Sequence, residues 1–434
     1  MKSEHNNWVL RGLYIILIAR LGLAWIAFAH PERSITVDSV GYLELADGIR
    51  LSGRFEATEY LESARTPGYP LFLAVVQAIC GEHIGPIVLV HLLITALTAW
   101  LLYRCGKILE AERVGLAAAW LYVLNPNSLF WSLTVLTETL FALLLILSFY
   151  TFLLAYDRMR LRWFALSGLL LGMSTLVRPI GLYLIPLWAL FILLVLRSSR
   201  GFIRALKFMT IFLVAALFLV LYWQTRNYVL KGSFSLSTIT EVTFSRYIAA
   251  DTLAEALSID REEALDIILQ TPDIMATSFH VIRQYPLSFM RVTIRGVART
   301  ALGTEAGTWM RVVFDKHYSG SGLLTALIRV DLKGIMEGLS MRVQAEEGPL
   351  GVLLLFWGVA YSIALYALVA LGLVRVFRTD RPLNRWILVF LLISAVYLIL
   401  IPLASGDARF RVPAAPLLAL LGGLAWLPYP SLDE

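Results

Sequence analysis

The chain has 434 residues, of which 59% are hydrophobic and 16% are charged, and its formal net charge is +6. Soluble domains are typically about 45–50% apolar and about 25% charged, so this composition excludes an ordinary soluble protein. Apolar runs of about 18 residues or more recur along the chain, and each can cross a bilayer. The sequence therefore predicts an all-α polytopic membrane protein. Its basic residues lie in short loops, which gives no reason to expect nucleic acid as a partner.

We interpret about ten apolar runs as transmembrane helices. They are residues 12–29, 84–103, 113–130, 132–156, 163–178, 180–196, 207–224, 350–374, 386–404 and 412–428. The further run 67–80 has 14 residues and is short for a span, so we place it as a helix in the outer interface. Four turns rich in lysine and arginine then fall on the cytoplasmic side, as the positive-inside rule requires. These turns are 104–113, 158–162, 197–207 and 375–385.

This topology leaves both termini in the cytoplasm and two large segments outside it. It divides the chain into a transmembrane module, 1–224, with an outer loop at 30–83, an extracytoplasmic and partly helical segment, 225–349, and C-terminal transmembrane helices, 350–434. We therefore expect an integral, multi-pass protein of the inner (cytoplasmic) membrane.

Asp38 stands at the start of a predicted amphipathic helix in the first outer loop. Tyr42, Leu45, Ala46 and Ile49 follow it at helical spacing, which is typical of a helix with one apolar face. Aspartate at this position commonly caps a helix. The alternative is a general base, held where lipid-borne and aqueous substrates meet.

Arg65 comes just before the predicted interfacial helix. Thr66 and Pro67 suit the N-cap and the first residue of that helix, but capping does not explain Arg65. An arginine beside a helix N-terminus can bind phosphate, because its guanidinium and the free backbone N–H groups point at the same anion. Arg65 is therefore a candidate phosphate ligand.

Arg20, Glu138 and Arg178 lie inside or at the edge of apolar spans. Ionisable groups are costly there and usually face the bundle interior or a cavity. They form either structural ion pairs, such as Glu138 with Arg178 or Arg20, or part of a binding pocket.

The segment Asp407–Pro413 precedes the last span and contains Arg409 and Arg411. If it is extended, these two side chains point to opposite sides, and only one faces a central pocket. The alternative is a charged outer loop. No HExxH or DxD motif occurs in the chain, so no metal site is expected. A divalent cation is compatible with the sequence, but no ligand cluster supports one.

Taken together, these motifs resemble the GT-C superfamily of membrane glycosyltransferases. The nearest branch contains the protein O-mannosyltransferases, their bacterial relatives and the aminoarabinose transferases that modify lipid A. The resemblance covers the first six spans and the last one. Its four motifs are Asp38-Ser39-Val40-Gly41-Tyr42, Arg65-Thr66-Pro67-Gly68-Tyr69-Pro70, Thr137-Glu138 and Arg409-Phe410-Arg411-Val412-Pro413.

The resemblance implies transfer of a sugar from a polyprenyl phosphate, outside the cytoplasm and with inversion. It assigns Asp38 to the acceptor side of catalysis and Arg65 to the donor phosphate. Relatives often have a second acid where this chain has Ser39, which weakens any two-carboxylate arrangement. The large soluble domain of many protein-modifying members is absent from the sequence, so we expect a glycan or lipid acceptor.

The same residues fit a simple picture of the site. Phosphate is a good leaving group, so the reaction needs cations and one base. We expect Arg65, Arg409 and Arg178 to hold the phosphate at one depth of the membrane. Glu138, Tyr69, Tyr42 and Arg20 are candidate pocket residues.

Two other functions remain open at this point. One is a polymerase or ligase that uses polyprenyl-pyrophosphate glycans, which would place its key acid and arginines in 225–349. The other is a flippase or transporter of lipid-linked sugars, which often has two related halves, and the sequence contains no such repeat.

Overall fold

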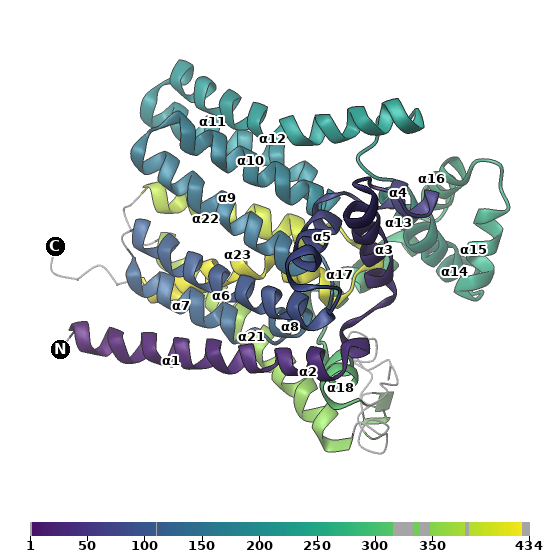
Figure 1. Ribbon diagram of the computed structural model, residues 1–434, viewed down its shortest axis with the longest axis horizontal. Coiled ribbons are helices and arrows are strands. Elements are labelled where there is room, and N and C mark those ends of the chain that lie inside the picture. The colour runs from purple at the N-terminus through teal and green to yellow at the C-terminus, as the bar shows by residue number, and fades with distance from the viewer. Residues whose placement is uncertain are drawn as a thin grey trace.

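In the computed structural model, residues 2–109, 111–315, 333–334, 336–337, 340, 348–377 and 382–427 are described, and the regular elements in these ranges are helical. The long helices run side by side as one bundle, while shorter helices gather at one end of it (Figure 1). The prediction of an all-α polytopic fold is confirmed.

Within the described ranges, the bundle contains ten helices and two short pieces that extend α1 and α23. They are α1 (Lys2–Gly22), α2 (Ala24–Ala29), α6 (Ile84–Ile108), α7 (Glu112–Val123), α9 (Glu138–Arg158), α10 (Leu161–Val177), α11 (Leu184–Arg200), α12 (Phe202–Lys231), α21 (Gly348–Phe377), α22 (Pro382–Leu400), α23 (Ala415–Gly423) and η6 (Leu424–Trp426).

Seven of the ten predicted spans coincide with helices that are long and apolar enough to cross a membrane. Two others, Leu161–Val177 and Arg385–Leu400, are apolar helical segments of fewer than 18 residues. The predicted span 113–130 is wrong as one helix. Asn125 caps a new short helix, α8 (Pro126–Trp131), by accepting the N–H groups of Asn127 and Ser128.

The predicted start of the next span is also wrong, because residues 132–137 form turns and α9 begins only at Glu138.

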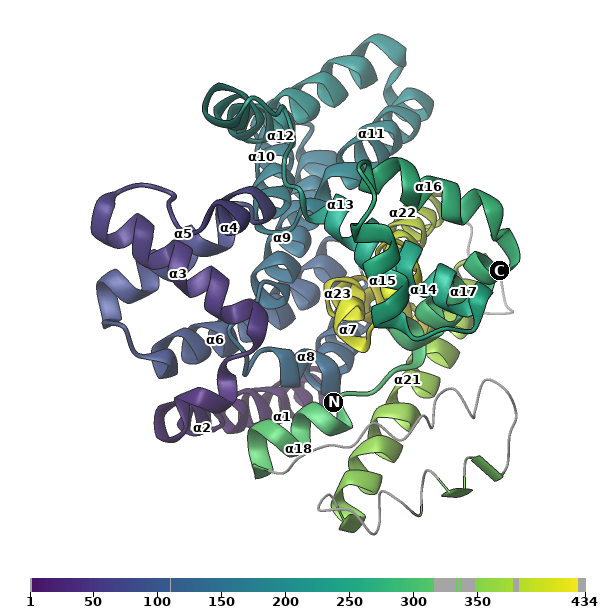
Figure 2. The same ribbon diagram turned by 90° about the vertical axis from the view of Figure 1, so that its right-hand side faces the viewer.

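Shorter helices cover one end of the bundle (Figure 2). They are η1 (Pro31–Ser34), α3 (Val37–Ser52), α4 (Glu59–Ala64), α5 (Gly68–Cys80), η2 (Pro179–Tyr183), α13 (Ile239–Thr243), η3 (Phe244–Ala249), α14 (Ala250–Leu257), α15 (Arg261–Leu269), α16 (Ile274–Gln284), α17 (Pro286–Leu302), α18 (Ala306–Phe314), η4 (Leu403–Ser405) and η5 (Ala408–Ala414).

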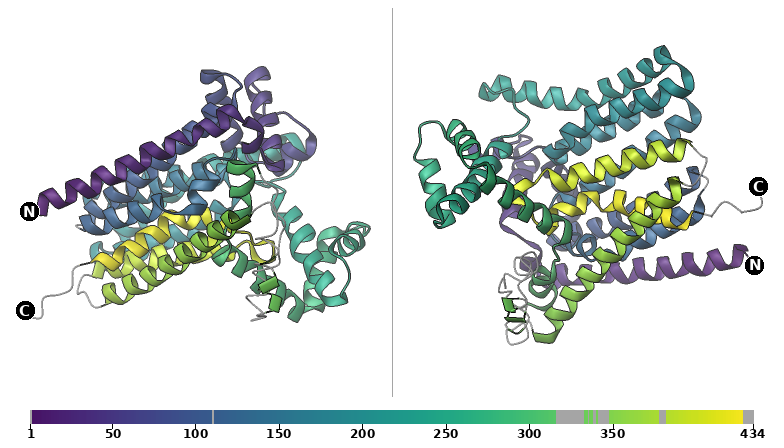
Figure 3. Two further views of the ribbon diagram at one scale, coloured as in Figure 1. Left: turned by 90° about the horizontal axis from the view of Figure 1, so that it is seen from below. Right: turned by 180° about the vertical axis from the view of Figure 1, so that it is seen from behind.

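We call this end of the bundle the covered end. Seen from it, α3–α5 lie on one side, α13–α17 lie on the other, and α8, α9 and α23 lie between them (Figure 2). Helices α14–α16 project as a lobe with a small core of its own (Figure 3), which includes Leu253, Ala264, Ile268 and Val281. The rest of the predicted outer segment, from 316 to 347, lies almost entirely outside the described residues, as do Arg378 and Arg381 of the last basic turn.

The α9–α10 and α11–α12 turns, which contain two of the basic clusters, lie at the opposite end, where α1 begins (Figure 1). If these basic turns lie in the cytoplasm, as the positive-inside rule predicts, the covered end lies outside it.

Glycines allow α10 to pack closely against α12 and α5. This packing fixes the position of the end of α10 that lies at the covered end. Gly168 and Gly172, four residues apart, face α12 so closely that an added Cβ would meet the carbonyl oxygens of Phe212 and Ala216. Small residues at this spacing commonly allow membrane helices to approach. At the covered end, a Cβ on Gly68 of α5 would lie 2.7 Å from the Leu176 carbonyl group of α10. Helix α5 is therefore fixed against the end of α10.

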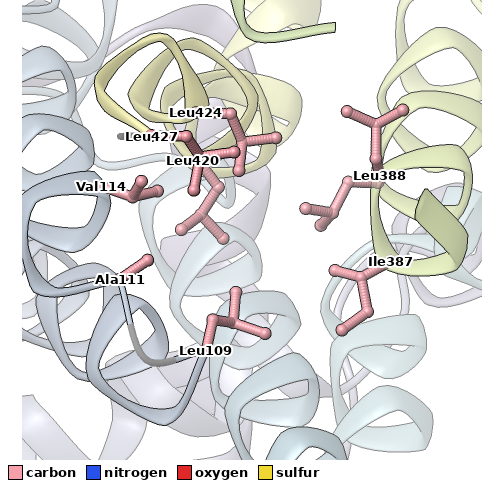
Figure 4. A pocket seen from close by; sticks show the side chains of 9 residues that line it. Leu109, Ala111, Val114, Ile387, Leu388, Leu420, Leu424 and Leu427 are labelled. Carbon is pink, nitrogen blue, oxygen red and sulfur yellow. The ribbon is translucent and has the colours of Figure 1, made fainter. Parts of the chain in front are cut away.

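An apolar pocket with an empty volume of about 390 Å³ lies at the end opposite to the covered one, between the α6–α7 turn, α22 and α23 (Figure 4). Its lining is entirely aliphatic and includes Leu109, Val114, Leu388 and Leu424. It shares no residue with the charged side chains of the covered end.

Candidate functional site

Five charged side chains form one connected cluster at the covered end. They are Asp38, Arg65, Glu138, Arg178 and Arg409, and we call them the charge cluster. Asp38 is bound by two arginines, with Arg65 Nη2 at 2.8 Å from Oδ1 and Arg409 Nη1 at 2.8 Å from Oδ2. Glu138 Oε1 accepts from both Arg409 Nε and Arg178 Nη1. Three positive and two negative charges leave a formal excess of one positive charge.

Asp38 is the second residue of α3, and its side chain does not cap that helix. Thr36 is the N-cap, because its hydroxyl accepts the N–H of Ser39 while the Ser39 hydroxyl accepts the N–H of Thr36. This reciprocal capping box closes the helix start without Asp38. The capping role considered for Asp38 is therefore wrong, and Ser39 has a structural role.

Arg65 ends α4 and also lies next to the start of α5. Its Nη1 donates to the Tyr42 hydroxyl at 3.2 Å, and its guanidinium lies 4.6 Å from the centre of the Tyr42 ring. The predicted capping by Thr66 is wrong. The Thr66 hydroxyl donates to the Val177 carbonyl at the end of α10, and α5 begins at Gly68. That bond joins the segment after Arg65 to the residue before Arg178.

Tyr42 and Tyr69 lie behind Arg65 and are buried. Their rings meet edge to face with centres 5.1 Å apart, and the Tyr69 hydroxyl lies 3.3 Å from His91 Nε2. These two candidate pocket residues therefore form the packed wall behind the cluster. His91 belongs to the same wall and is not a candidate site residue from the sequence.

Glu138 and Arg178 come from two helix ends. Glu138 is the first residue of α9 and is fully buried. Its carboxylate is favoured there by the positive end of the helix dipole. Arg178 follows α10 and donates from Nη1 to the Thr137 hydroxyl at 3.0 Å. The expected ion pair between Glu138 and Arg178 is present.

Arg409 reaches the cluster from η5, so this segment is a 3₁₀ helix and does not have the extended conformation that we considered. Asp407 caps this 3₁₀ helix by accepting the N–H of Arg409 at 2.9 Å. The two arginines of the segment nevertheless point to different places. Arg411 is buried and donates to the carbonyl groups of Ala301 and Gly303. Only Arg409 meets the carboxylates.

Arg20 does not join the charge cluster. It is buried in α1, and none of its three guanidinium nitrogens has a hydrogen-bond partner among the described residues. Of the two ion pairs considered for Glu138, the structure contains the one with Arg178 and not the one with Arg20.

Trp131 is a further residue of the site that the sequence did not indicate. It ends α8, and the Arg409 guanidinium lies 5.6 Å from the centre of its ring. Phe410 similarly lies beside Arg178 at 5.8 Å. These rings fix the directions of two arginines. Of these two aromatic residues, only Phe410 is indicated by the sequence, because it is part of the Arg-Phe-Arg motif.

Asp38 is the accessible acid of the cluster, since its side chain is 38% exposed while that of Glu138 is 0% exposed. Burial raises the pKa of Asp38, but Arg409 and Arg65 outweigh it and lower that pKa to about 2. Burial lowers the pKa of Arg65, whereas Tyr42 and Asp38 raise it, with a net rise. Asp38 is therefore ionised. A ligand can reach the arginines from the side on which Asp38 is exposed.

In the ranges that the structure describes, no group of three or more His, Cys, Asp or Glu side chains is arranged to hold a metal ion. The expectation about a divalent cation stays a prediction.

Solved structures share the fold of this helical bundle. The oligosaccharyltransferase of Archaeoglobus fulgidus in its apo form is 15% identical and has a TM-score of 0.51, covering 95% of this chain and 50% of that one. Its complex with an inhibitory peptide and a dolichol-phosphate gives a TM-score of 0.52 at 15% identity, with 97% and 50% covered. The chain thus spans about half the length of these relatives.

A family model matches one part of the chain. Residues 64–223 match the dolichyl-phosphate-mannose-protein mannosyltransferase family. The resemblance to the GT-C superfamily of membrane glycosyltransferases is therefore confirmed. ArnT from Cupriavidus metallidurans bound to undecaprenyl phosphate matches at 14% identity, with 98% of this chain and 78% of that one covered, but its TM-score of 0.43 is too low to carry an argument. A search of curated protein sequences finds no match.

Proposed function

We propose that this chain is a glycosyltransferase that moves a single sugar from a polyprenyl-phosphate donor to an acceptor outside the cytoplasm, with inversion. The observation that carries the proposal is the charge cluster at the covered end of a membrane bundle, in which Arg65 and Arg409 bind the accessible carboxylate of Asp38 and Arg178 pairs with the buried Glu138. A donor whose lipid tail stays in the bilayer must present its phosphate at such a surface.

Each member of the cluster has a role in this reaction. The acceptor hydroxyl attacks the anomeric carbon while its proton passes to Asp38, the general base. The bond from that carbon to the phosphate oxygen breaks, and the polyprenyl phosphate leaves with the bonding electrons. Arg65 and Arg409, helped by Arg178, hold the phosphate, whose charge grows as the sugar leaves. No general acid is required, because phosphate is a good leaving group.

The ion pairs of Asp38 also explain how the base becomes effective. With its pKa held near 2 by Arg409 and Arg65, Asp38 is a weak base. A donor phosphate recruits the same two guanidinium groups. Its arrival weakens their hold on Asp38 and raises the pKa of that carboxyl. The base is thus strengthened when the donor is in place.

Several features support this function over its rivals. The archaeal oligosaccharyltransferase that shares the fold has been solved with a dolichol-phosphate, which is the headgroup chemistry proposed here. A polymerase or ligase would place its arginines in 225–349. There, Arg291 and Arg295 pair with Glu255, and Arg299 donates to the Ala404 carbonyl.

The acceptor we propose is a glycan or lipid, and the protein is proposed to reside in the inner membrane.

The test is a turnover assay with purified protein in liposomes that contain a polyprenyl-phosphate-linked sugar. Release of free polyprenyl phosphate that requires the acceptor supports the proposal. Movement of the lipid-linked sugar across the bilayer without release indicates a flippase. Turnover only with pyrophosphate-linked glycans indicates a polymerase or ligase.

A further inference from the structure

Glu305 is a buried carboxyl that the proposed reaction does not use. It immediately precedes α18 and is 6% exposed. The Thr308 hydroxyl donates to its Oε2 at 2.9 Å, and its Oε1 has no hydrogen-bond partner among the described residues. A buried carboxyl with one free oxygen is costly when ionised, so its surroundings need an explanation.

The segment that carries Glu305 packs on the turn that carries Arg409. Arg411 of that turn donates to the carbonyl groups of Ala301 and Gly303, just before Glu305. An added Cβ on Gly303 would lie 2.9 Å from the Ala408 Cβ, so the two backbones are in close contact. A movement of Glu305 is therefore transmitted to η5.

Two supports of Arg409 act electrostatically on Glu305. One is Asp407, whose carboxylate caps η5 through the Arg409 N–H. The other is Trp131, whose ring lies against the Arg409 guanidinium and whose indole N–H has no hydrogen-bond partner among the described residues. Among the described residues, Arg411 is the other charged group that acts on Glu305.

The surroundings favour the protonated form of Glu305. Burial raises the pKa of its carboxyl, Asp407 raises it further, and Trp131, Thr308 and Arg411 lower it, with a result of about 8. At neutral pH the side chain is then an uncharged neighbour of Asp407. Once ionised, it repels Asp407 and attracts the cations of η5.

We propose that Glu305 is a positioning residue whose protonated form keeps Trp131 and the Asp407-capped turn in the arrangement that directs Arg409 to the donor phosphate. Loss of this proton shifts the turn and weakens the phosphate clamp, the name we give to Arg65, Arg409 and Arg178 around the donor phosphate. The inference rests on the proposed function, because it assigns Arg409 to the donor. It makes donor binding depend on a group that contacts neither substrate.

The size of the pH effect on donor affinity follows from the titration of Glu305 alone. With a pKa near 8, Glu305 is about 90% protonated at pH 7 and about 10% protonated at pH 9. If only the protonated form binds the donor well, affinity falls about tenfold between these pH values.

The probe is a polyprenyl monophosphate in detergent micelles, because its second ionisation lies near pH 6 and is already about 90% complete at pH 7. Its affinity for the full-length protein is measured from pH 6.5 to pH 9.5. We expect a roughly tenfold loss for the wild type between pH 7 and pH 9. For Glu305→Gln, which stays neutral, we expect less than a twofold change over the same interval. Glu255→Gln, a matched change in the outer lobe, should follow the wild type.

The outcomes separate the two proposals. If the wild type binds the probe equally at pH 7 and pH 9, the role of Glu305 is refuted, whether or not the variant folds. If the wild type loses affinity and Glu305→Gln loses it to the same extent, another group is responsible and the inference fails. If the wild type binds no polyprenyl phosphate at any pH, the proposed function itself fails.

Discussion

Replacing Asp38 by asparagine separates the two roles that the structure gives to this carboxylate. It is the proposed base, and it also occupies two arginines of the phosphate clamp. Asparagine keeps the shape and one acceptor oxygen but cannot take a proton. We therefore expect Asp38→Asn to lose turnover and, at the same time, to bind the donor phosphate more tightly.

The expected loss of turnover and the expected gain in phosphate affinity can both be estimated. Loss of a general base typically lowers the rate by about 10² to 10⁴. Hydrogen bonds to charged groups are worth about 1.5–3 kcal/mol. Because the Asp38 side chain is 38% exposed, we take the lower end of this range for the competition that the variant removes. About 1.5 kcal/mol corresponds to roughly tenfold tighter phosphate binding.

The assay measures turnover and polyprenyl phosphate affinity for the same preparation. Asp47→Asn is the matched control, since Asp47 lies on the same helix and pairs with Arg50 outside the cluster. It should leave both quantities unchanged. The reasoning is refuted if Asp38→Asn keeps near-wild-type turnover, or if it binds the phosphate no more tightly than the wild type.

Three further predictions concern single features. Arg409→Ala should lower turnover by at least tenfold because a phosphate ligand is lost, whereas Arg411→Ala should mainly lower the unfolding temperature, because its guanidinium bonds two buried carbonyl groups. The opposite pattern would show that the wrong arginine was assigned to the donor. With both native cysteines replaced, an impermeant thiol reagent added from outside should label a cysteine at Ser233 and not one at Ser198; the reverse would overturn the topology. The pKa of Glu305 is raised, so the folded state binds more protons than the unfolded one. Stability should fall as pH rises from about 4.5 to about 8, and unfolding midpoints of Glu305→Gln that follow the same slope would contradict this.

The sequence is sufficient to find all five members of the charge cluster, though not by one signal. Glu138 and Arg178 stand out because charge inside or at the edge of an apolar span is costly. Asp38 and Arg65 stand out by their places beside predicted helix starts in the outer loop, and Arg409 by its place just before the predicted last span. Their pairings could not be predicted, since Arg409 and Asp38 are 371 positions apart.

Contacts between residues far apart in the sequence also explain why some local predictions are wrong. Thr66 has a good capping sequence, yet the Val177 carbonyl, 111 positions away, accepts its hydroxyl. Trp131 had no local signal, because its importance comes from a ring contact with Arg409. Spans broken by short turns, such as the one at Asn125, were read as continuous because apolar composition alone hides a cap.

The spread of the charge cluster along the chain has a consequence for biosynthesis. Glu138 is made 40 residues before Arg178 and 271 residues before Arg409. At a synthesis rate of about 5–20 residues per second, the second arginine follows roughly 15 to 55 s after the glutamate. Arg178 arrives first and can shield the acid during membrane insertion. Since Arg409 belongs to the last span, the nascent chain lacks this member of the proposed phosphate clamp until synthesis is nearly finished, and we expect a product truncated before that span to be inserted but inactive.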